Sequence, residues 1–137
     1  MDDDFHVEHV EALARIVSRG VADLWMSSCA SHFGSTVDLL ADAPSLVRLH
    51  LGGLSLLDAT ALLVHATTPE LRDVEFFLSD ARFPARRIRD FGEALARLPS
   101  LRSVRLRLFA KPGDAARADR ALRSMLGSAV EVKAWTF

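Results

Sequence analysis

One short phrase returns three times along this chain of 137 residues, and it constrains the fold more than any other feature. The phrase is proline, then serine or glutamate, then leucine, two variable residues, and an alternation of apolar and polar residues. It reads APSLVRLHL at 43–51, TPELRDVEFF at 68–77 and LPSLRSVRLRL at 98–108. With Leu46, Leu71 and Leu101 aligned, the periods are 25 and 30 residues, which is typical of solenoids that stack supersecondary units.

Each phrase ends in a period-two alternation that predicts a strand with one buried face. Similar alternation in VADLWM at 21–26 and VEVKAW at 130–135 extends the series from three units to five. Apolar spacings of three and four predict helices over 86–100 and 116–126. We expect shorter helices over 35–43 and 58–68, with Ser35 and Asp58 as N-caps, and a first helix over roughly 5–18. Strands that alternate with helices over short connections favour a parallel sheet.

The segment LVRLHLGGLSL at 46–56 resembles the leucine-rich repeat consensus L-x-x-L-x-L-x-x-N-x-L. The helix lengths are similar to those of the ribonuclease-inhibitor-like and F-box-associated subclasses, and ALARIVSRGVADLWM at 12–26 resembles the opening of many F-box-associated repeat regions. One departure is Leu54, which occupies the position of the family's Asn or Cys, so we expect less regular turns.

This resemblance implies an α/β fold: a short leucine-rich-repeat-like solenoid with parallel strands on one face and helices on the other. We expect a single domain over 1–137. Within it, 1–19 form an N-terminal capping helix, 20–129 form about four strand–helix repeats, and 130–137 form a terminal strand.

The polar strand positions are predicted to project from the helix-free face and to align in rows across the strands. One row is Asp23, Arg48, Asp73, Ser103 and Glu131, and the next is Trp25, His50, Glu75, Arg105 and Lys133. Aromatic and arginine side chains contribute most to binding at protein interfaces. The sequence therefore predicts a non-catalytic protein-binding module, an adaptor or a subunit of a larger assembly. The expected contact residues are Trp25, Arg48, His50, Glu75, Phe77, Arg105, Arg107, Lys133 and Trp135.

Two of these aromatic residues have structural alternatives. Trp25 would instead pack under the first helix, and Trp135 would instead close the last repeat. The alternation of charge along the rows would, on the same view, only relieve repulsion on a solvated sheet, since each cross-strand pair contributes about 0.2–1 kcal/mol.

Charge and composition narrow the classes of partner. The chain has 17 basic and 18 acidic side chains, so we expect neither disorder nor nucleic-acid binding. Residues 1–45 hold eight acidic and two basic side chains, and residues 46–137 hold ten and fifteen. No apolar run approaches the roughly 20 residues of a membrane helix, and the acidic start and single cysteine, Cys29, favour a cytoplasmic protein without disulfides.

Other signals for chemistry are weak. The arginines of ARFPARRIRD at 81–90 would suit phosphate groups, but nearby acidic residues favour a solvated helix start with internal ion pairs. His6 with His9, and Cys29 with His32, are too few to predict a zinc site, which normally needs four ligands. The familiar catalytic motifs and a phosphate-binding glycine loop are absent, so we expect no enzyme and no cofactor.

One alternative function remains. LVRLHLGGLSLLDATALL at 46–63 also resembles the strand, turn and helix of anti-sigma-factor antagonist domains. This second resemblance implies a phosphorylation switch with Thr60 as acceptor, beside Asp58 and near a helix N-terminus that would stabilise the phosphate.

The C-terminal strand is a candidate edge for unwanted pairing. We expect this edge either to be shielded by Trp135 and Phe137 folding across it or to pair with a second chain. Removal of residues 130–137 is expected to expose the apolar underside of the preceding unit and to cause aggregation.

Overall fold

The computed structural model describes residues 22–26, 40, 44–80, 82–109 and 111–136. Five parallel strands form one sheet in the order of the chain. They are β1 (Asp23–Met26), β2 (Arg48–Leu54), β3 (Asp73–Leu78), β4 (Ser103–Leu108) and β5 (Glu131–Thr136). The described helices are α3 (Leu56–His65), α4 (Ala85–Ala96) and α5 (Pro112–Leu126).

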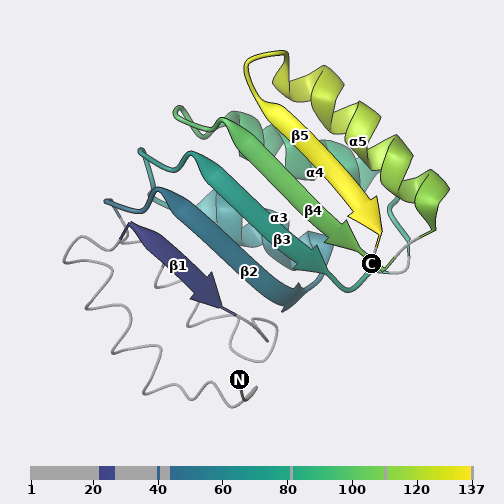
Figure 1. The fold of residues 1–137 in the computed structure, drawn as a ribbon, viewed down its shortest axis with the longest axis horizontal. Coiled ribbons are helices and arrows are strands. Elements are labelled where there is room, and N and C mark those ends of the chain that lie inside the picture. The colour runs from purple at the N-terminus through teal and green to yellow at the C-terminus, as the bar shows by residue number, and fades with distance from the viewer. Residues whose placement is uncertain (1–21, 27–39, 41–43, 81, 110, 137) are drawn as a thin grey trace.

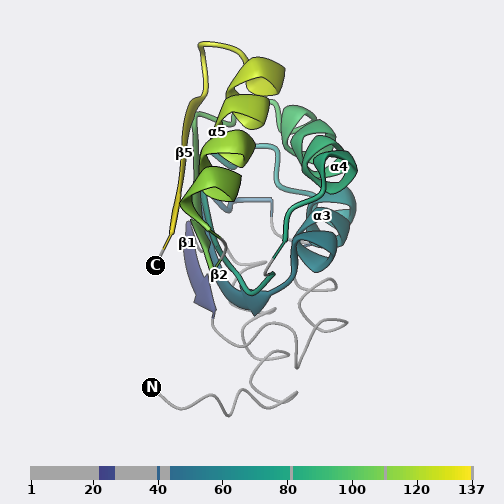
Figure 2. The same cartoon turned by 90° about the vertical axis from the view of Figure 1, so that its right-hand side faces the viewer.

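The described helices all lie on the same side of the sheet (Figure 1, Figure 2). The predicted α/β class, with parallel strands and helices on one face, is confirmed. The helix expected over 5–18 lies outside the described residues, as does that over 35–43 except for Leu40, which is helical and buried. None of the described helices is long and apolar enough to span a membrane.

The sequence repeat has a counterpart in the backbone hydrogen bonds. The carbonyls of Ala22, Val47 and Arg72 each accept two N–H groups from the start of the following strand, at 2.8–3.1 Å. The carbonyl of Arg102 accepts one, from Glu131 at 2.7 Å. The acceptors are separated by 25, 25 and 30 residues, so a backbone link recurs with the sequence repeat, and the link to β5 has one hydrogen bond instead of two.

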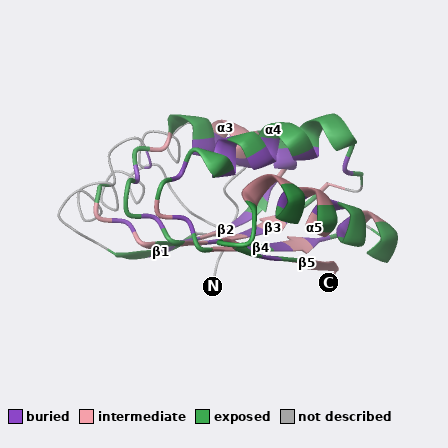
Figure 3. Cartoon of the chain, turned by 90° about the horizontal axis from the view of Figure 1, so that it is seen from above, coloured by how far each residue is buried: buried purple, intermediate pink, exposed green. Residues whose placement is uncertain are grey.

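The core lies between the sheet and the helices, where the inner surfaces of both are buried (Figure 3). The leucines that define the phrase, Leu46, Leu71 and Leu101, are all buried there. Phe76 of β3 meets Phe91 of α4 edge to face, with ring centroids 5.7 Å apart. Consecutive units therefore share one continuous core, as stacked repeats require.

The register agrees with the predicted rows. Asp23, Arg48, Asp73, Ser103 and Glu131 are aligned across the five strands, and so are Trp25, His50, Glu75, Arg105 and Lys133. The strand pairing is irregular near Leu54, whereas the regularity of the turns stays a prediction. The β2–β3 pairing shifts between Gly52 and Leu54, and Gly53 has a φ of 69°, which favours glycine.

Side chains from a different unit help to define the start of α3, and here one sequence prediction is wrong. Ser55, not Asp58, is the N-cap, because its hydroxyl accepts the N–H of Asp58 at 3.1 Å. Asp80, which follows β3, accepts the N–H of Leu56 at 2.6 Å. Two of the four N–H groups that a helix start leaves unpaired thus have side-chain acceptors.

The free edge of β5 is covered by α5, which lies beside it in Figure 1. Arg123 donates to the carbonyl of Val132 at 2.8 Å, and Asp119 accepts the N–H of Ala134 at 3.1 Å. Asp119 and Arg123 are themselves an ion pair at 2.7 Å. One residue of a neighbouring parallel strand would bond the same two backbone groups. The expected shield by Trp135 is therefore wrong, and Phe137 lies outside the described residues.

Candidate interaction face

The helix-free side of the sheet, here called the strand face, carries the outward side chains of all five strands. All-parallel sheets normally have helices on both sides. Among the described residues, no helix covers this side (Figure 2). The strand face divides into two parts by its contacts. The paired half consists of Asp23, Trp25, Arg48, His50, Asp73 and Glu75, and the cationic half consists of Phe77, Arg105, Arg107, Lys133 and Trp135.

The paired half begins with an exposed aromatic stack. Trp25 of β1 lies flat on His50 of β2, with ring centroids 3.7 Å apart and an interplanar angle of 10°. Trp25 is nevertheless 69% exposed. The alternative in which this indole packs under a helix is therefore wrong, and one ring face is presented to solvent.

His50 is held in its neutral form. Burial lowers its pKa below 6.5, and the carboxylates of Glu75 and Asp23 oppose this effect only in part. Arg105 and Arg48 lower the pKa further. The imidazole Nδ1 is buried without a hydrogen-bond partner among the described residues, 4.0 Å from a Glu75 oxygen. The row that includes Trp25 thus presents a neutral ring stack next to a carboxylate.

Arg48 connects the acidic residues of the paired half. Its Nε lies 3.9 Å from Asp23 and 3.5 Å from Asp73, one on each neighbouring strand. These side chains are exposed, and ion pairs of this kind contribute about 0–1 kcal/mol. Their main effect is therefore to neutralise the charge of Arg48, the one arginine within strands β1, β2 and β3.

The cationic half is organised around aromatic rings instead of carboxylates. The Arg107 guanidinium lies 5.2 Å from the centroid of Phe77 on β3 and 5.1 Å from that of Trp135 on β5. Lys133 is 5.3 Å from the same indole. Trp135 therefore belongs to the strand face, aligned with Arg107, and does not close the end of the core as the alternative held.

This arrangement leaves cationic groups without anionic partners. Arg105, Arg107 and Lys133 form no ion pair within the part of the chain that the structure describes. The Nε of Arg107 is buried and lacks a hydrogen-bond acceptor in the same set of residues. A buried donor of this kind is costly unless a partner satisfies it.

A shallow hollow of about 490 Å³ joins the two halves. Trp25, His50 and Glu75 line it on one side and Arg105 on the other. The structure thus brings together the nine residues that the sequence predicted as contacts, on adjacent strands of one face. The row Gly52, Phe77, Arg107 and Trp135, which organises the cationic half, was not recognised. Its members lie two positions further along each strand than His50, Glu75, Arg105 and Lys133, so the same alternation predicts it.

The basic segment at 81–90 differs from expectation. Phe83 is buried, and Asp80 accepts a backbone N–H of α3. The arginines at 82, 86, 87 and 89 are exposed, and the internal ion pairs predicted for them are not found among the described residues. Phe83 therefore belongs to the core, and no aromatic ring of this segment accompanies the arginines at the surface.

The candidate metal-binding pairs, His6 with His9 and Cys29 with His32, lie outside the described residues. Within the described ranges, no group of three or more His, Cys, Asp or Glu side chains is placed to hold a metal ion.

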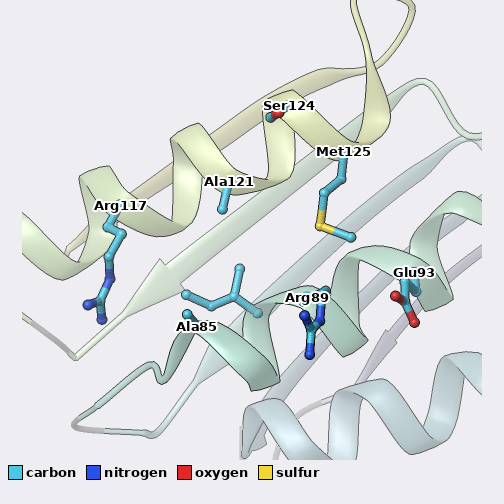
Figure 4. A pocket seen from close by; sticks show the side chains of 8 residues that line it. Ala85, Arg89, Glu93, Arg117, Ala121, Ser124 and Met125 are labelled. Atoms are coloured by element: carbon cyan, nitrogen blue, oxygen red, sulfur yellow. The ribbon is translucent and has the colours of Figure 1, made fainter.

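A second hollow, of about 380 Å³, lies between α4 and α5 (Figure 4). Its floor is largely apolar, with Ile88, Ala121 and Met125, and its rim has Arg89, Glu93 and Arg117. The helices approach closely at Gly92, where an added Cβ would lie 2.6 Å from the Met125 sulfur. The mixed charges of the rim give this groove no preference for one ligand, so it does not rival the strand face.

The chain was also compared with known proteins. No protein-family model, curated protein or solved structure matches it.

Proposed function

We propose that this protein is a non-catalytic protein-binding module that contacts its partner through the strand face, as a cytoplasmic adaptor or a subunit of a larger assembly. One observation carries the proposal. The side of the all-parallel sheet that no described helix covers presents two tryptophans, one 69% exposed and one in contact with two cations, within rows of charged side chains. Exposed aromatic and arginine groups of this kind dominate the energetics of protein interfaces.

We further propose that the chain is a short solenoid of the leucine-rich repeat type. The recurring strand links, the sequential strand order and the one-sided helices support this reading. Repetition gives each unit a neighbour that buries its apolar face. It also aligns the outward residues in rows, and this alignment makes a continuous binding surface.

The alternative phosphorylation switch is less well supported. Thr60 lies in the second turn of α3, and its hydroxyl donates to the Leu56 carbonyl at 2.8 Å. A phosphate on Thr60 would therefore lie beyond the unpaired N–H groups that stabilise an anion at a helix start. Thr60→Glu tests this function directly, because a switch requires it to alter binding.

The proposed face is tested by recovery of bound proteins from cells that express the tagged chain. The test variant combines Trp25→Ala with Arg105→Glu on the strand face. The control combines Leu57→Ala with Arg120→Glu on the helices, which also truncates one exposed apolar side chain and reverses the charge of one exposed arginine. We expect the test variant to reduce partner recovery at least ~10-fold, equivalent to about 1.4 kcal/mol, and the control to leave it unchanged. Equal recovery with both variants would contradict the proposal.

A further inference from the structure

We infer that the cationic half of the strand face binds an acidic segment of the partner protein, an extended stretch with carboxylates on alternate residues. The inference rests on the proposed function, because it names the chemistry of the partner that this face binds. It is carried by a contrast within the described part of the chain, between cations that form ion pairs with carboxylates and cations that form none.

The cationic half carries more positive than negative charge. On the paired half, Arg48 lies between two carboxylates. On the cationic half, Arg105, Arg107 and Lys133 have no ion pair among the described residues, and one carboxylate, Glu131, shares their strands on this face. This end of the face therefore has an excess of positive charge that an anionic group would neutralise.

The Arg107 side chain is positioned by its neighbours before any ligand binds. Arg107 is held between the rings of Phe77 and Trp135, and its buried Nε has no hydrogen-bond acceptor among the described residues. The guanidinium remains charged at any physiological pH and presents donors in a fork that matches a carboxylate. Because its position is already fixed by the rings, little side-chain entropy is lost when an anion binds.

The cations on β4 have the same spacing as alternate side chains of an extended peptide. Arg105 and Arg107 are two residues apart on β4, which corresponds to about 6.6 Å, and Lys133 lies opposite Arg105 at the strand spacing of about 4.8 Å. Alternate side chains of an extended peptide are also about 6.6–6.8 Å apart. Carboxylates at positions i and i+2 of such a segment would therefore meet Arg105 and Arg107 together, with Lys133 beside the first.

The acidic neighbours favour a short segment over a long polyanion. Asp73 and Glu75 lie on β3, directly beside the cationic half, and Asp23 lies further along the face. A nucleic acid that extended across all five strands would meet all three carboxylates, whereas a short segment that runs along β4 and β5 would pass only Glu75, which is aligned with Arg105. Phosphate-rich polymers and a second copy of this chain are therefore outcomes that the test must separate.

The experiment uses the full chain and a fluorescent peptide of alternating Asp and Ser, followed by fluorescence anisotropy. We expect binding that weakens as salt is added, and a peptide of alternating Asn and Ser that does not bind. Arg107→Gln should weaken binding ~10-fold, in line with loss of a charge-assisted hydrogen bond. The matched variant Arg120→Gln, on the exposed side of α5, should leave affinity within about twofold.

Several results would overturn the inference. These are no binding of the Asp peptide, equal binding of the Asn peptide, an equal effect of Arg120→Gln, or tighter binding of single-stranded DNA than of the peptide. A concentration-dependent dimer that excludes the peptide would assign the face to a second copy and would also overturn it. Failure here is distinct from failure of the proposed function. The Trp25→Ala, Arg105→Glu variant could abolish partner recovery while the Asp peptide fails to bind. In that case binding through the strand face would be supported, and the acidic segment as its ligand would be ruled out.

Discussion

The two halves of the strand face share one scaffold but differ in how their charges are satisfied. On the paired half, Arg48 contacts carboxylates on both neighbouring strands, and a neutral His50 lies under Trp25. On the cationic half, Arg107 contacts rings on both neighbouring strands. The same repeated geometry thus supports two chemistries, and the outward residues alone decide which one appears. The repeated apolar positions therefore predict the fold, whereas the chemistry of the partner depends on the residues between them.

The largest effect is expected from the shared scaffold. Phe91 is fully buried against Phe76, so Phe91→Ala should lower the free energy of unfolding by about 3–5 kcal/mol. Trp25→Ala on the surface should cost far less, because the indole is 69% exposed. Denaturant unfolding of both variants checks the comparison. A surface variant as costly as the core variant would show that the face is structural.

A smaller effect is expected from the edge beside the cationic half. Asp119→Ala with Arg123→Ala removes the side chains that bond Val132 and Ala134, so stability should fall by about 1–3 kcal/mol. The exposed edge should also promote self-association.

Size exclusion with light scattering measures the mass of this double variant against Arg120→Ala, a change on the exposed side of the same helix. We expect concentration-dependent oligomers from the double variant and none from Arg120→Ala. A double variant that remains monomeric at all concentrations would show that α5 does not protect this edge.

The ion pairs of the paired half should matter little for folding. Arg48→Gln removes both contacts, but the side chains are exposed, so the expected loss is below about 1 kcal/mol. Chemical denaturation at low and at high salt checks this value. A loss of several kcal/mol would mean that the paired half, unlike the cationic half, is built for stability.

The smallest effect should appear as a pH dependence. The pKa of His50 is lowered by burial, so the unfolded state binds a proton more readily than the folded state. Above pH 6.5, protonation of His50 therefore does not reduce the free energy of unfolding. As the pH drops from 6.5 through the lower pKa that His50 has in the folded state, the free energy of unfolding falls. Thermal unfolding of wild type and His50→Gln across this range should show a shallower acid loss in the variant. Parallel curves would contradict the assignment.

The sequence predicted the features that depend on periodic apolar residues. Alternation in the repeated phrase indicated which strand residues point outward. Alignment of Leu46, Leu71 and Leu101 predicted which residues pair between β2, β3 and β4. Contacts between distant polar residues were not predicted. Asp80 binds the start of α3 from 24 residues away, and Asp119 binds Ala134 from 15 residues away. No periodic pattern marks such pairs, because they depend on where α3 and α5 lie relative to the sheet.

We expect ligand chemistry to differ between the two halves, and the chain provides one tryptophan as a reporter for each. It contains two tryptophans, Trp25 on the paired half and Trp135 on the cationic half. Their indole N–H signals can be assigned by Trp25→Phe and Trp135→Phe and followed by NMR during titration with the Asp and Ser peptide. Our prediction is that the Trp135 signal shifts until binding is saturated, while the Trp25 signal stays in place. Movement of Trp25 alone, or equal movement of both signals, would contradict it.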